Sequence, residues 1–176
     1  MELKKITYLL VIICLLFASC EFLLGKDDEL FIKRENYNGY ALKLDGYYYR
    51  YLSDYAIYTF FLNRNGTLST AGSFEIDKGY KYEKWFLDSD FKEKVAKMKI
   101  SWGVFKISGE EIILEKWYSK EGPKPAFISK GQILNDTTFI LTKLIKKKGG
   151  AEKSINEVYH FKKFKHKLDS VSKFID

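Results

Sequence analysis

Two histidines and two cysteines are the side chains in this sequence best suited to metal binding or to nucleophilic and acid–base catalysis. His160 and His166 are six residues apart, a spacing that matches no standard metal-binding pattern. Cys14 and Cys20 both lie within the first twenty residues. We therefore expect no metal site, no cofactor and no thiol chemistry in the folded domain.

Paired carboxylates are a second source of chemistry, because two of them facing each other across a cleft can hydrolyse glycosidic bonds. Glu75 and Asp77 have the opposite parity to the apolar side chains of an expected strand, which is typical of carboxylates that face solvent. Asp88 and Asp90 are better explained as residues that cap a helix. Ser69 has no nucleophile-elbow sequence around it. The sequence therefore favours a protein that is not an enzyme and has no catalytic residues.

The N-terminus has the three-part layout of a secretory signal. Lys4–Lys5 form a positive start, Ile6–Phe17 is an apolar run, and Ala18–Ser19 are small residues directly before Cys20. A helix that spans a bilayer needs roughly twenty apolar residues. Because this run is shorter, it favours an export signal over a permanent transmembrane anchor.

The small pair followed by Cys20 resembles the lipobox of bacterial lipoproteins, whose cysteine is diacylated and whose chain is cut just before it. The resemblance implies a signal peptide over residues 1–19, palmitate-type chains on Cys20, a lipidated tether over residues 20–43 and a folded domain over residues 44–176. It also implies the bacterial cell envelope, at the outer membrane, facing either the periplasm or the cell surface. The alternatives are an ordinary signal peptide with a chance cysteine and a buried core helix.

The expected tether contains the polar cluster Lys26–Glu29. A lysine followed by acidic residues near the lipidated cysteine resembles a surface-export signal of Bacteroidetes lipoproteins. A hydrated spacer explains the same residues, and the sequence does not decide between the two.

The folded domain is expected to be rich in β-strands, because aromatic residues make up 17% of the chain and only two prolines occur. Eight β-like runs follow one another with short turns between them, and Asn65–Gly66 is a strong hairpin signal. In the third run, alternate residues from Leu68 to Ile76 are expected to share one face. The runs are Gly46–Leu52, Tyr55–Leu62, Thr67–Ile76, Ile100–Ile107, Glu111–Tyr118, Ala126–Leu134, Thr137–Ile145 and Ile155–Phe164.

One helix is expected between the third and fourth runs, over Asp90–Lys99. Asp90 can cap it and Glu93 completes a capping box. The whole pattern predicts an all-β fold, an antiparallel up-and-down barrel of about eight strands with one short helix, because closure removes the exposed edges of a sheet.

Two resemblances point to families. Leu44–Tyr48 resembles the Gly-x-aromatic start of the first strand in lipocalin-like, calycin-type barrels, which implies that fold. Trp102–Ile107, Glu115–Trp117 and Gly131–Phe139 resemble segments of small Bacteroidetes lipoproteins with no known activity.

A barrel of this size is either filled by its own side chains or holds one small ligand. We expect a small apolar or amphipathic ligand, and an envelope protein bound by the loops is the alternative. Ordinary core packing explains the same aromatic residues, and the sequence does not tell which strand face points inward. The candidate ligand-binding residues are Tyr47, Tyr49, Tyr58, Phe60, Phe105, Trp117 and Tyr159.

The formal net charge of +7 is moderately basic. An exported lipoprotein does not meet nucleic acid, so we expect no nucleic-acid partner. Anionic lipid headgroups or acidic glycans fit the excess of positive charge better than nucleic acid does, and a solvated lysine-rich surface is the simpler explanation.

Overall fold

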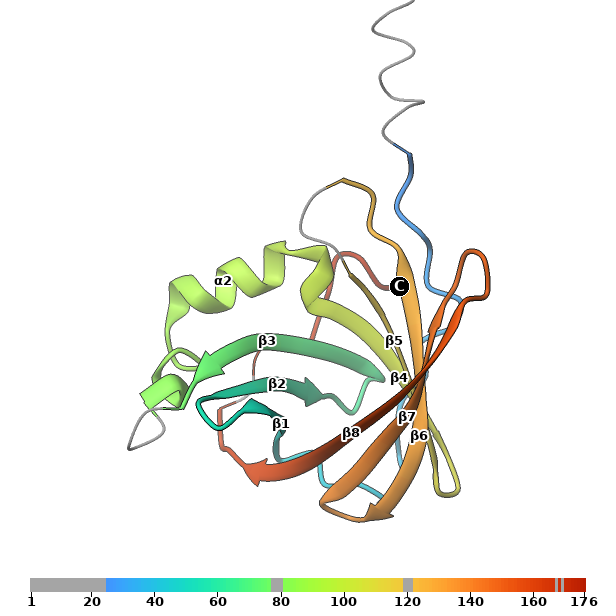
Figure 1. Cartoon of the computed structure of the whole chain (residues 1–176). Helices are drawn as coiled ribbons and strands as arrows, with labels where there is room; N and C mark the ends of the chain where they lie inside the picture. The colour runs from blue at the N-terminus through green and yellow to red at the C-terminus, as the bar shows by residue number, and fades with distance from the viewer. Residues whose placement is uncertain (1–24, 77–80, 119–121, 167, 169) are drawn as a thin grey trace, which may run out of the picture.

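The protein is a closed antiparallel barrel, shown in the computed structural model of Figure 1. The structure describes residues 25–76, 81–118, 122–166, 168 and 170–176. Within these residues eight strands each pair with the next along the chain, and β8 pairs back with β1. The expected all-β, up-and-down barrel is confirmed. The strands are β1 (Gly46–Ser53), β2 (Ala56–Leu62), β3 (Thr67–Glu75), β4 (Trp102–Ser108), β5 (Glu111–Trp117), β6 (Ala126–Asn135), β7 (Thr138–Lys146) and β8 (Glu152–Lys163).

The turn between β2 and β3 forms at the expected Asn–Gly pair. Gly66 has a φ of +82°, in the left-handed region that only glycine adopts readily. A side chain at Gly66 would also collide with the Glu35 carbonyl oxygen, which lies 2.1 Å from an ideal Cβ position. The Asn65 side-chain oxygen accepts hydrogen bonds from the Thr67 N–H and hydroxyl, at 3.2 and 2.8 Å.

A helical segment between β3 and β4 covers one side of the barrel (Figure 1). It comprises η1 (Lys81–Lys84), α2 (Ser89–Lys97) and η2 (Lys99–Ser101). The expected cap at Asp90 is wrong, because the Asp88 carboxylate accepts a hydrogen bond from the Phe91 N–H at 2.7 Å. Asp88 therefore starts the helix, and the extended backbone of Met98 ends it.

A β-bulge overturns the expected single face of β3. Ala71 is an extra residue in the pairing of β3 with β2, and the next residue, Gly72, has a φ of +108°. The alternation therefore reverses within the strand. Leu68 packs inside the barrel, whereas Phe74 packs outside it, against the side chains of η1 and α2.

The interior is packed at one end of the barrel, which we call the closed end. It lies at the turns that join β2 to β3, β4 to β5 and β6 to β7. Aromatic rings pack closely there, with Tyr159 stacked on Phe139 at 5.0 Å between ring centroids. The buried interior residues are Leu42, Leu44, Tyr48, Phe60, Leu62, Leu68, Phe105, Ile112, Leu114, Phe139, Leu141 and Tyr159.

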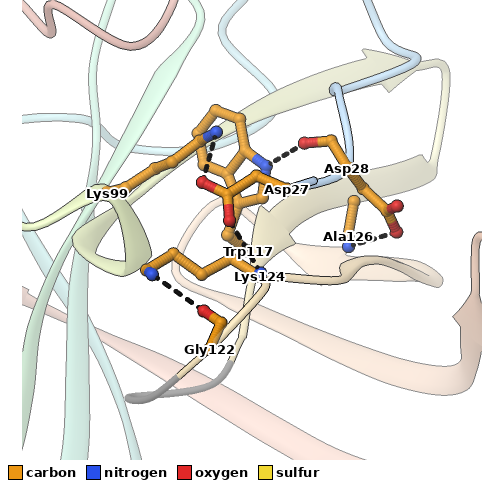
Figure 2. A network of polar contacts seen from close by, with 7 residues as sticks. All are labelled: Asp27, Asp28, Lys99, Trp117, Gly122, Lys124 and Ala126. Carbon is orange, nitrogen blue, oxygen red and sulfur yellow. Dashed lines mark hydrogen bonds and ion pairs between the residues drawn. The ribbon is translucent and has the colours of Figure 1, made fainter. Parts of the chain in front are cut away.

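Residues 25–44 form no helix or strand, but polar contacts fasten them to the barrel (Figure 2). The Asp28 carboxylate accepts a hydrogen bond from the Ala126 N–H at 3.0 Å and pairs with Lys148 at 2.7 Å. The Trp117 indole N–H donates to the Asp28 carbonyl at 2.6 Å. Asp27 pairs with Lys99 at 2.9 Å. Asp27 and Asp28 are therefore held against the barrel and are not part of a freely hydrated spacer. Cys20 lies outside the described residues.

Glu115 fastens residues 25–44 to the barrel at a second place, Phe31 and Ile32. Its side chain is fully buried on the outer face of β5. Both carboxylate oxygens accept hydrogen bonds from the Phe31 N–H, at 2.9 and 2.8 Å, and one also accepts from the Ile32 N–H at 2.7 Å. Backbone donors that have no strand partner are thus satisfied by one carboxylate.

We expect Glu115→Gln to lower the free energy of unfolding by about 2 kcal/mol. The amide replaces one acceptor oxygen with a donor and removes the charge that strengthens these hydrogen bonds. Urea denaturation followed by circular dichroism measures the change. The control is Glu111→Gln, at the exposed end of the same strand. Equal stabilities of the two variants would show that Glu115 does not fasten the segment.

Candidate ligand cavity

A cavity of about 1210 Å³ occupies the end of the barrel opposite the closed end, which we call the open end. It lies between the helical segment and the halves of the strands at the open end. β3 and β4 pair only over Thr67–Ser69, near the closed end, so these two strands do not pair with each other beside the cavity. Side chains of α2 and η2 form its roof. Its apolar lining includes Phe74, Phe91, Val95, Met98, Ile100, Leu144, Ile155 and Phe174.

The floor of the cavity is polar and rests on the packed core. It consists of Arg50, Tyr58, Thr70, Lys116, Ser129, Glu157 and Tyr159. Each charged member follows apolar residues of the same strand at a spacing of two, so its side chain points inward with theirs. A hollow with an apolar roof and a polar floor is suited to an amphipathic molecule.

Arg50, Glu157 and Tyr159 form a closed network on the floor. The Arg50 guanidinium pairs with the Glu157 carboxylate at 3.1 Å, and its Nε–H donates to the Tyr159 hydroxyl at 3.1 Å. That hydroxyl donates to the other Glu157 oxygen at 3.0 Å. Burial, followed by the charge of Glu157, raises the pKa of Tyr159, so its hydroxyl stays protonated.

Lys116 is a buried cation beside this network, with 9% of its surface exposed. Its ammonium donates hydrogen bonds to the Tyr58 hydroxyl and, at 3.3 Å, to the Thr70 hydroxyl. It also lies 4.9 Å and 4.8 Å from the ring centroids of Tyr58 and Tyr118. Desolvation lowers the pKa of Lys116, but these tyrosines and Glu157 outweigh it, so the pKa lies above its ordinary value. The hydrogen bonds to Tyr58 and Thr70 and the two ring faces favour the ammonium form of Lys116 over the neutral amine.

The candidate ligand-binding residues fall into three groups. Tyr58, Trp117 and Tyr159 line the cavity. Phe60 and Phe105 belong to the packed core beneath it. Tyr47 and Tyr49 face outward, toward the side chains under η1 and α2. The ligand-binding role of all seven stays a prediction.

Arg50, Lys116 and Glu157 were missed by sequence reasoning, although a signal for them exists. Ile112, Leu114 and Lys116 alternate on one face of β5. A charged residue that continues an apolar face marks the point where a core ends or a polar site begins. Arg50 on β1 and Glu157 on β8 continue inward faces in the same way.

Metal binding finds no support in the described part of the chain. No group of three or more histidine, cysteine or acidic side chains is placed there to hold an ion. His160 lies on the outer face of β8, with its ring centroid 5.8 Å from that of Tyr49. Among the described residues, no helix is both long enough and apolar enough to cross a membrane.

Comparisons with known proteins identify no relative. No protein-family model, no curated protein and no solved structure matches this chain.

We expect three buried tyrosines to resist ionisation in alkaline solution. Burial raises the pKa of Tyr47, Tyr48 and Tyr159. Tyrosine in an unfolded chain ionises near pH 10. Because the fold favours their neutral form, their contribution to stability is complete below about pH 10 and is lost as the pH rises through the raised pKa values.

Absorbance at 295 nm, recorded with circular dichroism, measures this ionisation. The late step in absorbance should coincide with unfolding, and Tyr159→Phe should shrink it by one tyrosine. If every tyrosine ionised at about pH 10 in the folded protein, the burial described above would be contradicted.

Proposed function

We propose that the protein is a lipid-anchored lipoprotein of the bacterial envelope that binds a small amphipathic molecule in its barrel. The observation that carries the proposal is the cavity, with its apolar roof and polar floor. Its volume of about 1210 Å³ is large enough for a drug-sized or lipid-like molecule. The packed core at the closed end leaves the open end as the route of entry.

The position of the N-terminal segment supports the anchor. Asp27 lines the rim of the cavity, and Gly25 lies beside Pro123. Cys20 precedes Gly25 by five residues, and five residues span at most about 18 Å. A lipid on Cys20 would therefore keep the open end close to a membrane surface, where an amphipathic molecule can be exchanged with the bilayer.

A second candidate function is the binding of an envelope protein. Large side chains are exposed at the turn between β1 and β2, where Tyr51, Leu52 and Tyr55 have 59%, 44% and 77% of their surface exposed. Exposed aromatic residues of this kind are common at protein–protein interfaces. This candidate makes no use of the cavity.

We expect Cys20→Ser to release the protein from membranes. Lipid chains contribute about 0.8 kcal/mol for each buried methylene, and without them the protein has no anchor of comparable strength. Fractionation of cells that express the full chain measures the effect. Cys14→Ser is the matched control, because Cys14 lies within the signal sequence and should leave fractionation unchanged. Membrane fractionation of Cys20→Ser that equals the wild type would refute lipidation.

We expect Leu144→Trp to weaken binding of a small amphipathic fluorescent probe by tenfold or more, because the larger ring occupies the cavity that Leu144 lines. Leu134→Trp is the control, since Leu134 is exposed on β6. Fluorescence titration of the purified protein measures both. Absence of binding to the wild type, or equal weakening in both variants, would exclude the cavity and leave the protein-binding function.

A further inference from the structure

We propose that Lys116 binds the carboxylate of a monoanionic amphipathic ligand, whose apolar chain lies under α2 and η2. This inference rests on the proposed function, because it names the chemical class of the molecule in the same cavity. The chemistry is that of a fatty acid: one negative charge at the end of an apolar chain.

Lys116 is a buried cation without an ionic partner. Among the described residues, no carboxylate forms an ion pair with its ammonium, whose polar contacts are the Tyr58 and Thr70 hydroxyls. Removing a charge from water is costly. Hydroxyl groups, rings and the more distant Glu157, which Arg50 already neutralises, offset this cost only in part. A carboxylate beside the ammonium would supply the missing negative charge.

The neighbouring cation is already neutralised. Arg50 pairs with Glu157 at 3.1 Å, so the floor holds two cations and one carboxylate. This balance favours a ligand with a single negative charge. A phosphate monoester, with close to two charges, would leave the floor negative.

Four lysines line the rim of the cavity, and two of them, Lys94 and Lys124, form no ion pair among the described residues. Lys97 pairs with Glu93 on the exposed face of α2, and Lys99 pairs with Asp27 at 2.9 Å. Lys116 differs from all four rim lysines in being buried, so water and salt screen its charge less and an anionic group is attracted to it more strongly.

The floor also offers hydrogen-bond donors. An ammonium has three N–H groups, and two of those of Lys116 are used by Tyr58 and Thr70. The third is available to a ligand. The Tyr58 hydroxyl accepts from Lys116 and shares a 3.3 Å hydrogen bond with the Thr70 hydroxyl, in which either group can donate. When Thr70 donates, the Tyr58 proton can be donated to a carboxylate oxygen. The buried Ser129 hydroxyl lies on the same floor.

The lining above Lys116 fits an apolar chain. Met98 and Ile100 line the roof, and Leu144 and Ile155 line the opposite wall. A molecule that enters with its carboxylate first would place its chain among these side chains. The ligand would then bury apolar surface and satisfy the unpaired cation in one orientation.

The test compares dodecanoate with 1-dodecanol, which has the same chain and no charge. Isothermal titration calorimetry at pH 8, below the micelle concentration, measures both affinities for the purified wild-type protein, for Lys116→Met and for Lys130→Met. Methionine has a similar length and no charge. Lys130 is exposed on the neighbouring strand β6 and serves as the control.

We expect the wild type to bind dodecanoate about 10- to 100-fold more tightly than dodecanol, because a hydrogen bond between charged groups raises an affinity by about this factor. Lys116→Met should remove this preference and leave dodecanol affinity unchanged, whereas Lys130→Met should behave as the wild type. Equal binding of both molecules to the wild type would overturn the role of Lys116 without the need for any variant. Binding of neither molecule would instead overturn the proposed function.

If Lys116→Met fails to fold, Thr70→Val provides the second variant, because it removes one partner of the ammonium on the same floor. It should weaken dodecanoate several-fold more than dodecanol. An equal effect on the two molecules would contradict the inference.

Discussion

Closure of β1 onto β8 is the contact on which the rest of the structure depends. Gly46 pairs with Lys163 at this seam, and an ideal Cβ on Gly46 would lie 2.0 Å from the Lys162 carbonyl oxygen. Only glycine lets the two strands approach this closely. Once the seam is closed, strand alternation directs Tyr48 and Arg50 inward and turns Tyr47 outward.

The closed barrel uses its interior in two ways. Toward the closed end, apolar side chains pack into a solid core. Toward the open end, β1, β5 and β8 each place a charged side chain on the inward face, as Arg50, Lys116 and Glu157. These side chains need hydrogen-bond partners and do not fill space as branched aliphatic residues do. Because apolar residues at these positions would make a more stable protein, we infer that the polar floor serves function rather than folding.

Local sequence patterns predicted much of the fold. The strands followed from apolar runs and turn residues, and the β2–β3 turn followed from Asn65–Gly66. The β-bulge at Ala71 could not be predicted from a local pattern, because it depends on how β3 pairs with β2. The start of α2 was misplaced by two residues, since Asp88 and Asp90 are both good caps and only the backbone conformation decides between them. The sequence did not show which face of each strand points into the barrel, because closure of β1 onto β8 decides this.

The candidate site was less predictable than the fold, for a physical reason. Aromatic side chains have the same sequence pattern in a core and in a cavity. The sequence therefore could not show that Phe60 belongs to the packed core and Tyr58 to the cavity, because this depends on how far the packed core extends along the barrel. The N-terminal segment was also unpredictable. It has no periodic pattern, and its position depends on Glu115 and Trp117, which lie more than eighty residues further along the chain.

The central claim is that the open end of the barrel holds an amphipathic molecule with its charged group on the polar floor. A crystal structure of the protein purified from bacterial membranes, without added ligand, tests it most directly. The account predicts elongated electron density in the cavity, with its polar end within hydrogen-bond distance of the Lys116 ammonium. A cavity closed by side chains, with Lys116 paired to a carboxylate of the protein itself, would contradict it.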